Sequence, residues 1–140
     1  MPEENKGEYI QLETGYEFPP KSFNLDAEAV SVYQKAVEDS SSLYHDTNLV
    51  PPLAVATFAM KILAEGLALL PGAIHVSQEF EFIDSVSVSE KLTSYAKVGR
   101  TRSRGGLHLM DVDLSVLNPD HKTVLTGKTS FVLPEQGGKR

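Results

Sequence analysis

One long apolar segment sets the strongest limit on what this chain of 140 residues can fold into. Residues 53–70 are almost uninterrupted in their apolarity, and as a helix they would be about 27 Å long. Lys61 and Glu65 lie four residues apart in this segment, so both side chains would occupy one narrow side of the helix. These charges argue against a membrane span and predict a helix that protein surrounds on most sides.

Residues that start and end helices bound this segment, and a shorter helix is expected before it. Pro51 and Pro52 suit a helix start, because the N–H group that proline lacks is not needed in the first turn. A Pro-Gly pair at 71–72 ends the segment. Asp26 can cap a first helix that runs to about position 38, and residues 43–50 are expected to form a loop.

The second half of the chain alternates apolar and polar side chains, which is typical of strands with one buried face. Strands are expected at about 74–82, 92–98, 110–116 and 124–133, with turns at 102–106 and 118–120 and a short early strand at 9–12. The apolar side of the 74–82 strand is expected to hold Ile74, Val76, Phe80 and Phe82. One apolar helix and one such sheet can bury their apolar surfaces only against each other. We therefore predict an α+β fold, a long central helix wrapped by a curved antiparallel sheet of about five strands.

Composition narrows the possible classes of function. With 41% apolar and 23% charged residues, residues 1–140 are expected to form one soluble domain, with 1–8 and 134–140 as frayed ends. The absence of cysteine excludes a disulfide scaffold and fits a reducing compartment, and with no signal-peptide pattern we expect a cytoplasmic protein. A net charge of −6 argues against a nucleic-acid partner. The histidines match no metal-site spacing, so no metal is expected.

Acidic and imidazole side chains precede the start of the central helix. Proton transfer beside a carbonyl group needs a base, an acid and hydrogen-bond donors that polarise the carbonyl oxygen. Asp39 and His45 could share the first two tasks, and a backbone N–H near Pro52 to Ala54 could perform the third. The alternatives are that Asp39 only bonds nearby backbone N–H groups, that Tyr44 packs as a half-buried aromatic ring and that His45 is a surface residue.

The order of these elements resembles the MaoC-like hydratase and dehydratase family, whose fold is the hotdog fold. The motifs that carry the resemblance are Phe-Glu-Phe at 80–82, a basic turn that ends in Gly105 and Gly106, Asp-Val-Asp-Leu at 111–114, Asn-Pro-Asp at 118–120 and Thr-Gly-Lys-Thr at 126–129. The similarity extends over about residues 15–133.

The catalytic loop of that family reads Gly-Asp-x-Asn-Pro-x-His-x-Asp. Asp39 and Asp46 match its acids, Tyr44 takes the histidine position, and His45 follows one residue later. The resemblance implies catalytic roles for Asp39, Tyr44 and His45, and a substrate-binding role for the residues at the start of the central helix. These are Val50, Pro51, Pro52, Leu53 and Ala54. Tyrosine in the histidine position and the two prolines also resemble the non-catalytic, degenerate N-terminal-type domain of two-domain and heteromeric relatives.

Three arginines alternate along the end of one predicted strand. The side chains of Arg100, Arg102 and Arg104 would leave the same side of the strand. In an acidic protein this arrangement indicates an anion site, such as one for the phosphates of coenzyme A or for an acidic acyl carrier protein. A solvated hairpin tip is the alternative.

The resemblance predicts an acyl-thioester hydratase or dehydratase that acts across a 2-enoyl/3-hydroxyacyl bond. It would need no cofactor, and the substrate would be carried on coenzyme A or acyl carrier protein. The alternatives are a non-catalytic acyl-binding subunit that pairs with a catalytic hotdog partner, and an acyl-CoA thioesterase. An open sheet edge and an incompletely covered helix predict a homodimer or a larger even oligomer, with sites at the interface.

Overall fold

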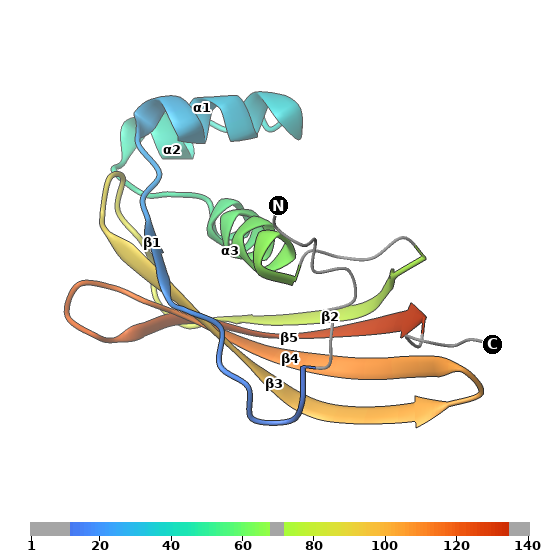
Figure 1. The fold of residues 1–140 in the computed structure, drawn as a ribbon. Helices are drawn as coiled ribbons and strands as arrows, with labels where there is room; N and C mark the ends of the chain where they lie inside the picture. Colours follow the sequence, from blue (N-terminus) through green and yellow to red (C-terminus); the bar gives the residue numbers. More distant parts are fainter. Residues whose placement is uncertain (1–11, 68–71, 135–140) are drawn as a thin grey trace, which may run out of the picture.

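The computed structural model of the chain describes residues 12–67 and 72–134 (Figure 1). Its helices are α1 (Ala27–Ala36), α2 (Leu43–Asp46) and α3 (Pro52–Leu67). Its strands are β1 (Lys21–Phe23), β2 (Ile74–Phe82), β3 (Leu92–Arg104), β4 (Leu107–Leu117) and β5 (Thr123–Pro134).

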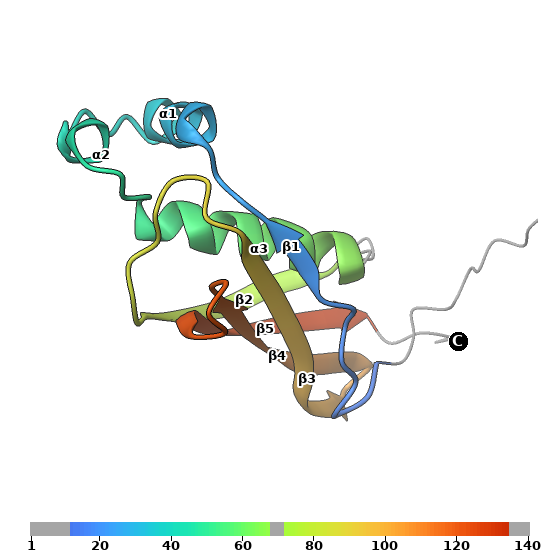
Figure 2. The same ribbon diagram turned by 90° about the vertical axis from the view of Figure 1, so that its left-hand side faces the viewer.

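The strands form one antiparallel sheet in the order β1-β3-β4-β5-β2, so β1 and β2 are its edges. The sheet curves around α3, which confirms the predicted arrangement of a central helix against an antiparallel sheet (Figure 1). The short helices α1 and α2 lie on the side of α3 that faces away from the sheet, near the start of α3 (Figure 2). No helix in the described residues is long and apolar enough to cross a membrane.

Local sequence signals explain the start of α1 and the two hairpin turns. The Asp26 carboxylate accepts a hydrogen bond of 2.8 Å from the Ala29 N–H, so the predicted N-cap is confirmed. The Asn118 side-chain oxygen accepts bonds from the N–H groups of Asp120 and Lys122, which closes the predicted turn between β4 and β5. The other turn is shorter than predicted, because β3 continues to Arg104 and the turn consists of Gly105 and Gly106, with φ of 59° and 83°.

Two element predictions need correction. The expected loop at 43–50 begins with the short helix α2. The first strand of the sheet is β1, and Leu12 lies in no strand, while residues 9–11 of the predicted early strand lie outside the described residues. The predicted C-terminal end of the central helix also lies outside them, since α3 is described to Leu67.

A bulge in β2 corrects the prediction that its four apolar side chains share one face. The register shifts between His75 and Ser77, so Ile74 pairs with Val132 while Phe82 pairs with Leu125. One extra residue reverses the direction of every side chain beyond it. Ile74 therefore lies on the outer face of the sheet, away from α3, and is 57% exposed.

Within residues 12–67 and 72–134, the core consists of two hydrophobic clusters, one packed against each half of α3. The first cluster lies under the start of α3 and contains Leu25, Val30, Val50, Ala54, Val55, Ala56, Ala59, Val86, Leu92, Val116, Val124 and Leu125. The second lies towards its end and contains Phe18, Leu63, Val98, Met110, Val112, Leu114 and Phe131. On the predicted inner faces of β4 and β5, seven residues are buried and Leu133 is partly buried against the second cluster; the buried ones are Met110, Val112, Leu114, Val116, Leu125, Thr129 and Phe131.

Candidate functional site

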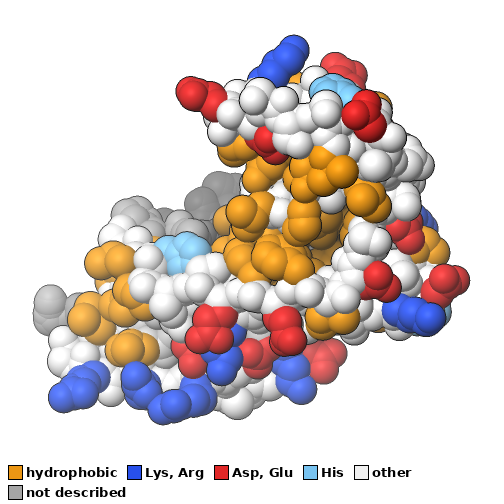
Figure 3. Space-filling model, turned by 180° about the vertical axis from the view of Figure 1, so that it is seen from behind, with side chains coloured by type: hydrophobic (Ala, Val, Ile, Leu, Met, Phe, Trp, Pro, Cys, Tyr) orange, Lys and Arg blue, Asp and Glu red, His pale blue; other side chains and the backbone are white. Residues whose placement is uncertain are grey.

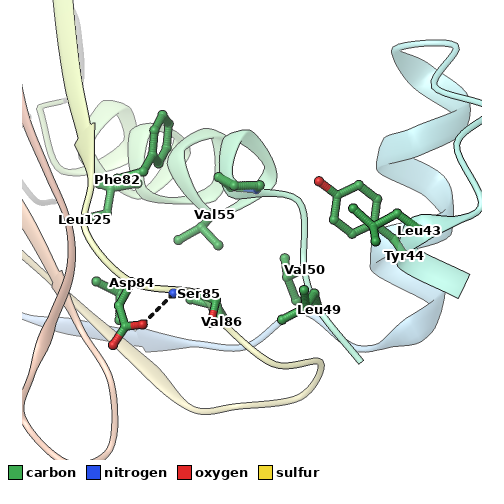
Figure 4. Close-up of a pocket in the computed structure, with 12 residues that line it drawn as sticks. Leu43, Tyr44, Leu49, Val50, Val55, Phe82, Asp84, Ser85, Val86 and Leu125 are labelled. Carbon is green, nitrogen blue, oxygen red and sulfur yellow. Dashed lines mark hydrogen bonds between the residues drawn. The ribbon is translucent and has the colours of Figure 1, made fainter. Parts of the chain in front are cut away.

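An apolar pocket lies between α2, the first turn of α3 and the connection from β2 to β3 (Figure 4). It is lined by Leu43, Tyr44, Leu49, Val50, Pro52, Val55, Phe82, Asp84, Ser85, Val86, Val124 and Leu125. Its volume is about 120 Å³, somewhat smaller than the cavity of about 150 Å³ that holds benzene in an engineered protein. On the surface, apolar side chains fill the hollow between the α1–α2 lobe and the sheet (Figure 3).

Backbone hydrogen bonds hold the two chain segments that form the pocket. The Val50 N–H donates to the Val86 carbonyl at 2.9 Å, and the Val88 N–H donates to the Asn48 carbonyl at 2.8 Å. The chain before α3 is therefore fixed against the β2–β3 connection by paired backbone groups. These contacts join residues 36 and 40 positions apart, so no local sequence pattern predicts the pocket that they enclose.

Two titratable side chains lie among the described residues that line the pocket. Tyr44 comes from α2, and its hydroxyl group points towards the start of α3 (Figure 4). Asp84 lies on the opposite side of the pocket, where the chain leaves β2. Its Oδ1 atom accepts a hydrogen bond of 2.8 Å from the Ser85 N–H.

Asp39, the first of the three predicted catalytic residues, lies in the loop between α1 and α2. Its Oδ1 atom accepts a 2.9 Å hydrogen bond from the Ser41 N–H, which is the local backbone role named as its alternative. Burial raises the pKa of the Tyr33 hydroxyl, and the negative charge of Asp39 raises it further. Among the described residues, Asp39 is not one of those that line the pocket.

His45 is exposed on α2, and in the described part of the chain it does not line the pocket. Its N–H donates to the Ser42 carbonyl at 3.0 Å, a bond that belongs to the short helix itself. Of the three predicted catalytic residues, the structure thus places Tyr44 in the pocket and the other two outside it.

The predicted substrate-binding residues at the start of α3 point in different directions. Val50 and Pro52 line the pocket, whereas Leu53 is 53% exposed and faces away from the core. Pro51 is buried, and Ala54 is fully buried in the first core cluster. The Ala54 N–H donates to the Pro51 carbonyl at 2.9 Å, so this predicted donor for an enolate oxygen is already engaged.

The three arginines share the outer face of the sheet, as their alternation predicted. Arg100 and Arg102 line a separate cleft together with Val76, Ser77, Leu109, Asp111, Ser130 and Phe131. The Ser130 hydroxyl donates to the Asp111 carboxylate in this cleft. Arg104 is exposed beside the β3–β4 turn. Because Leu109 and Asp111 alternate with the buried Met110 and Val112, this cleft faces away from α3 and from the apolar pocket.

Asp84, Ser85 and the apolar residues of β2 and β5 that line the pocket were not among the predicted site residues. Asp84 closely follows a predicted strand in which apolar and polar residues alternate. A polar residue at the end of such a strand is a candidate site residue, and this position could have pointed to Asp84. Within the described residues, no group of three or more His, Asp or Glu side chains is placed to hold a metal ion.

Comparisons with known proteins identify the fold. Sequence comparison finds no matching family model and no matching curated protein. Among solved structures, the chain is similar to an (R)-hydratase of A. caviae involved in PHA biosynthesis, with a TM-score of 0.76 and 20% identity over 88% of this chain and 98% of that chain. A MaoC-like dehydratase from Rhodospirillum rubrum gives a TM-score of 0.75 and 17% identity over 91% of this chain and 96% of that chain.

A third similar structure is the HadBC complex of Mycobacterium tuberculosis, a 3R-hydroxyacyl-ACP dehydratase. Its TM-score is 0.67, with 20% identity over 85% of this chain and 96% of that chain. The chain therefore has the hotdog fold. Its structural neighbours include MaoC-like dehydratases and hotdog-fold hydratases.

Proposed function

We propose that this chain binds the acyl group of an acyl thioester in the apolar pocket and adds or removes water across a 2-enoyl/3-hydroxyacyl bond. The observation that carries the proposal is the position of Tyr44, which matches the family's histidine in sequence and lines an apolar pocket at the start of α3. The hydratase and dehydratase activities of the structural neighbours support it.

The pocket suits the acyl part of such a substrate. All of its lining residues except Tyr44, Asp84 and Ser85 are apolar, so a saturated or unsaturated chain can replace water there. A volume of about 120 Å³ favours a short acyl group. In this proposal Tyr44 provides a hydroxyl donor at the reacting end, and Asp39 and His45 assist proton transfer from the loop around it.

The arginines are proposed as an anion site for the carrier rather than for the acyl group. They lie on the outer face of the sheet, so a ligand whose acyl chain fills the pocket of the same chain does not meet them. They are placed to hold the phosphates of coenzyme A or an acidic carrier protein when the acyl group binds to a neighbouring subunit.

A second hotdog subunit is proposed to cover the hollow beside β2. This strand pairs only with β5 in the described sheet, and a free strand edge can pair with another chain. Large apolar side chains are exposed around the hollow at Leu43, Leu53, Phe82 and Ile83. A homodimer or a larger even oligomer would bury both surfaces.

The alternative proposal is a non-catalytic acyl-binding subunit of a hetero-oligomer. It is favoured by Tyr44 in the histidine position, by the engaged Ala54 N–H and by the complex that HadBC forms. Binding of crotonyl-CoA without its hydration, together with a stable complex with a second hotdog chain, would support this alternative. A purified homo-oligomer that hydrates crotonyl-CoA by itself would exclude it.

Hydration of crotonyl-CoA, followed by the loss of its conjugated absorbance, tests the main proposal. Leu43→Trp places a large side chain at the pocket mouth and is expected to lower kcat/KM about tenfold or more. Val32→Trp is the matched control, because Val32 is 60% exposed on α1 and does not line the pocket. Equal rates in both variants would contradict the pocket assignment. Release of free thiol without hydration would indicate a thioesterase instead.

A further inference from the structure

A second cavity lies along the later half of α3. It is lined by this helix, by β3 and β4 and by residues 16–21, which lead into β1 (Figure 2). Its volume is about 250 Å³, about twice that of the pocket near α2, and among the described residues the two share no lining residue. Most of its wall is apolar, including Phe18, Ile62, Leu63 and Leu114. Since an apolar cavity of about 150 Å³ holds benzene, this one can hold a longer apolar chain.

Hydrogen bonds and a ring contact fix the wall that residues 16–21 provide. The Phe18 N–H donates to the Ala96 carbonyl at 3.0 Å. The Val98 N–H donates to the Tyr16 carbonyl at 2.9 Å. The rings of Tyr16 and Phe18 meet edge to face, with their centres 5.1 Å apart. This wall is therefore attached to β3 by paired backbone groups, and the cavity is formed before any ligand binds.

Gly66 on α3 supplies part of the space in this cavity. Within a helix glycine is less favourable than alanine, so a glycine there needs a reason. Its φ lies outside the positive region that favours glycine. Among the described residues outside its own helix, a Cβ atom at this position would meet the Phe18 ring at ordinary contact distances of 3.5 and 3.9 Å. Neither the backbone nor close packing requires glycine here, and its missing side chain leaves room for a ligand.

Two polar groups lie side by side at the edge of this apolar space. Lys21 on β1 and Ser94 on β3 are directly opposite each other in the antiparallel pair, and both line the cavity. The Cβ atoms of such partners are about 5 Å apart, so an ammonium and a hydroxyl group can reach the same ligand group. Ser94 is 4% exposed, and a buried hydroxyl group needs a hydrogen-bond partner, which a ligand can supply. A carboxylate accepts from both donors.

We propose that this cavity is a second ligand site, which binds a carboxylic acid with an apolar chain. The chain lies between α3 and the sheet, and the carboxylate binds between Lys21 and Ser94. Lys21 is the one charged side chain among the described residues that line the cavity, which suits a single negative charge better than the several phosphates of coenzyme A. The site is separate from the pocket near α2, so its test does not depend on the proposed function.

Titration calorimetry of the full chain with octanoate and with 1-octanol tests the role of the charge. Lys21 is exposed, so Lys21→Gln removes the charge without disturbing the core. This variant is expected to bind octanoate about fivefold more weakly, while its affinity for octanol changes by less than about twofold. Lys97→Gln is the matched control, because Lys97 is exposed on the outer face of β3. Wild-type protein that does not bind octanoate, or a Lys21→Gln variant that binds it as wild type does, would overturn the proposal.

Variants that fill the cavity test the location of the ligand. Gly66→Leu is expected to weaken octanoate and octanol about tenfold or more, because its side chain occupies the space of the apolar chain. Ala64→Leu is the matched control, since Ala64 is exposed on the same helix. Leu43→Trp, which narrows the pocket near α2, is expected to change octanoate binding by less than about twofold. Loss of octanoate binding in Leu43→Trp but not in Gly66→Leu would place the ligand near α2 and overturn the proposal.

Discussion

The two ends of the sheet differ in the kind of surface that they offer. At the end near α2, β2 and β5 close an apolar pocket whose titratable groups are Tyr44 and Asp84. At the end near the β3–β4 turn, the outer face carries Arg100, Arg102 and Arg104 beside a polar cleft. The sequence predicted that the start of α3, which borders the pocket, and the three arginines bind parts of one substrate. The structure separates them by several residues along the strands and by the thickness of the sheet.

This difference teaches that alternation along a strand fixes the face of a side chain but not its distance from a pocket. Arg102 pairs with Leu109 and lies opposite the core, as its position in the alternation requires. Whether it also meets a ligand depends on which end of the sheet the start of α3 covers. That end is set by contacts between the chain at 48–50 and the chain at 86–88.

The largest expected effect is on the free energy of unfolding, and it compares one phenylalanine from each end of the sheet. Phe131 is 3% exposed in the core cluster near the arginines, whereas Phe82 is 44% exposed at the pocket. Phe131→Ala is expected to lower the free energy of unfolding by about 3–5 kcal/mol, because it leaves a cavity. Phe82→Ala is expected to cost about 1 kcal/mol or less, since much of its ring is already in contact with water. Urea unfolding of both variants measures this, and equal losses would contradict the contrast.

A smaller effect, on the affinity for butyryl-CoA, is expected when two of the arginines lose their charge. The double variant Arg100→Gln and Arg102→Gln is expected to weaken binding of butyryl-CoA about threefold to tenfold at low salt, because phosphate contacts are lost. Binding of butyryl-pantetheine, which lacks the nucleotide phosphates, should not change. Titration calorimetry with both ligands separates a carrier site from a solvated hairpin tip. Equal weakening of both ligands would argue against a phosphate site, and no change in either would favour the solvated tip.

The smallest expected effect is a pH dependence of the protein's stability that arises from Tyr33 on α1. Burial raises the pKa of Tyr33 above 10.0, and the charge of Asp39 adds to this. As the pH rises, the unfolded chain therefore loses this proton before the folded chain does, so stability falls above about pH 10 and is unaffected below it. Tyr33→Phe should reduce this alkaline loss, and Asp39→Asn should lower the pKa of Tyr33. Tyrosinate absorbance and unfolding between about pH 9 and 11 provide the measurements, and an unchanged Tyr33 titration in Asp39→Asn would contradict the stated cause.

Features that depend on neighbouring residues could be predicted from the sequence. Asp26 caps α1 because its carboxylate reaches an N–H three residues later, and the inner faces of β4 and β5 follow from strict alternation. The bulge between His75 and Ser77 has no comparable signal, so the direction of Ile74 was predicted wrongly. The apolar pocket could not be recognised, because it depends on the contact between the β2–β3 connection and the chain before α3.

The roles of Asp39, Tyr44 and His45 illustrate the same limit within one short loop. Their order in the sequence matches the family loop, but side-chain directions in a helix as short as α2 depend on what it packs against. Tyr44 is half-buried and packs against the first core cluster, whereas His45 next to it is exposed. The sequence predicted that this loop lies near the site. The packing of α2 against the core determines which of its side chains lines the pocket.

The central claim is that the acyl group binds between α2, the start of α3 and the β2–β3 connection. A crystal structure with butyryl-CoA tests it most directly. The account predicts butyryl carbons within about 4 Å of Val55, Leu125 and Tyr44. A butyryl group bound on the outer face of the sheet beside Arg102, with the apolar pocket left open, would contradict it.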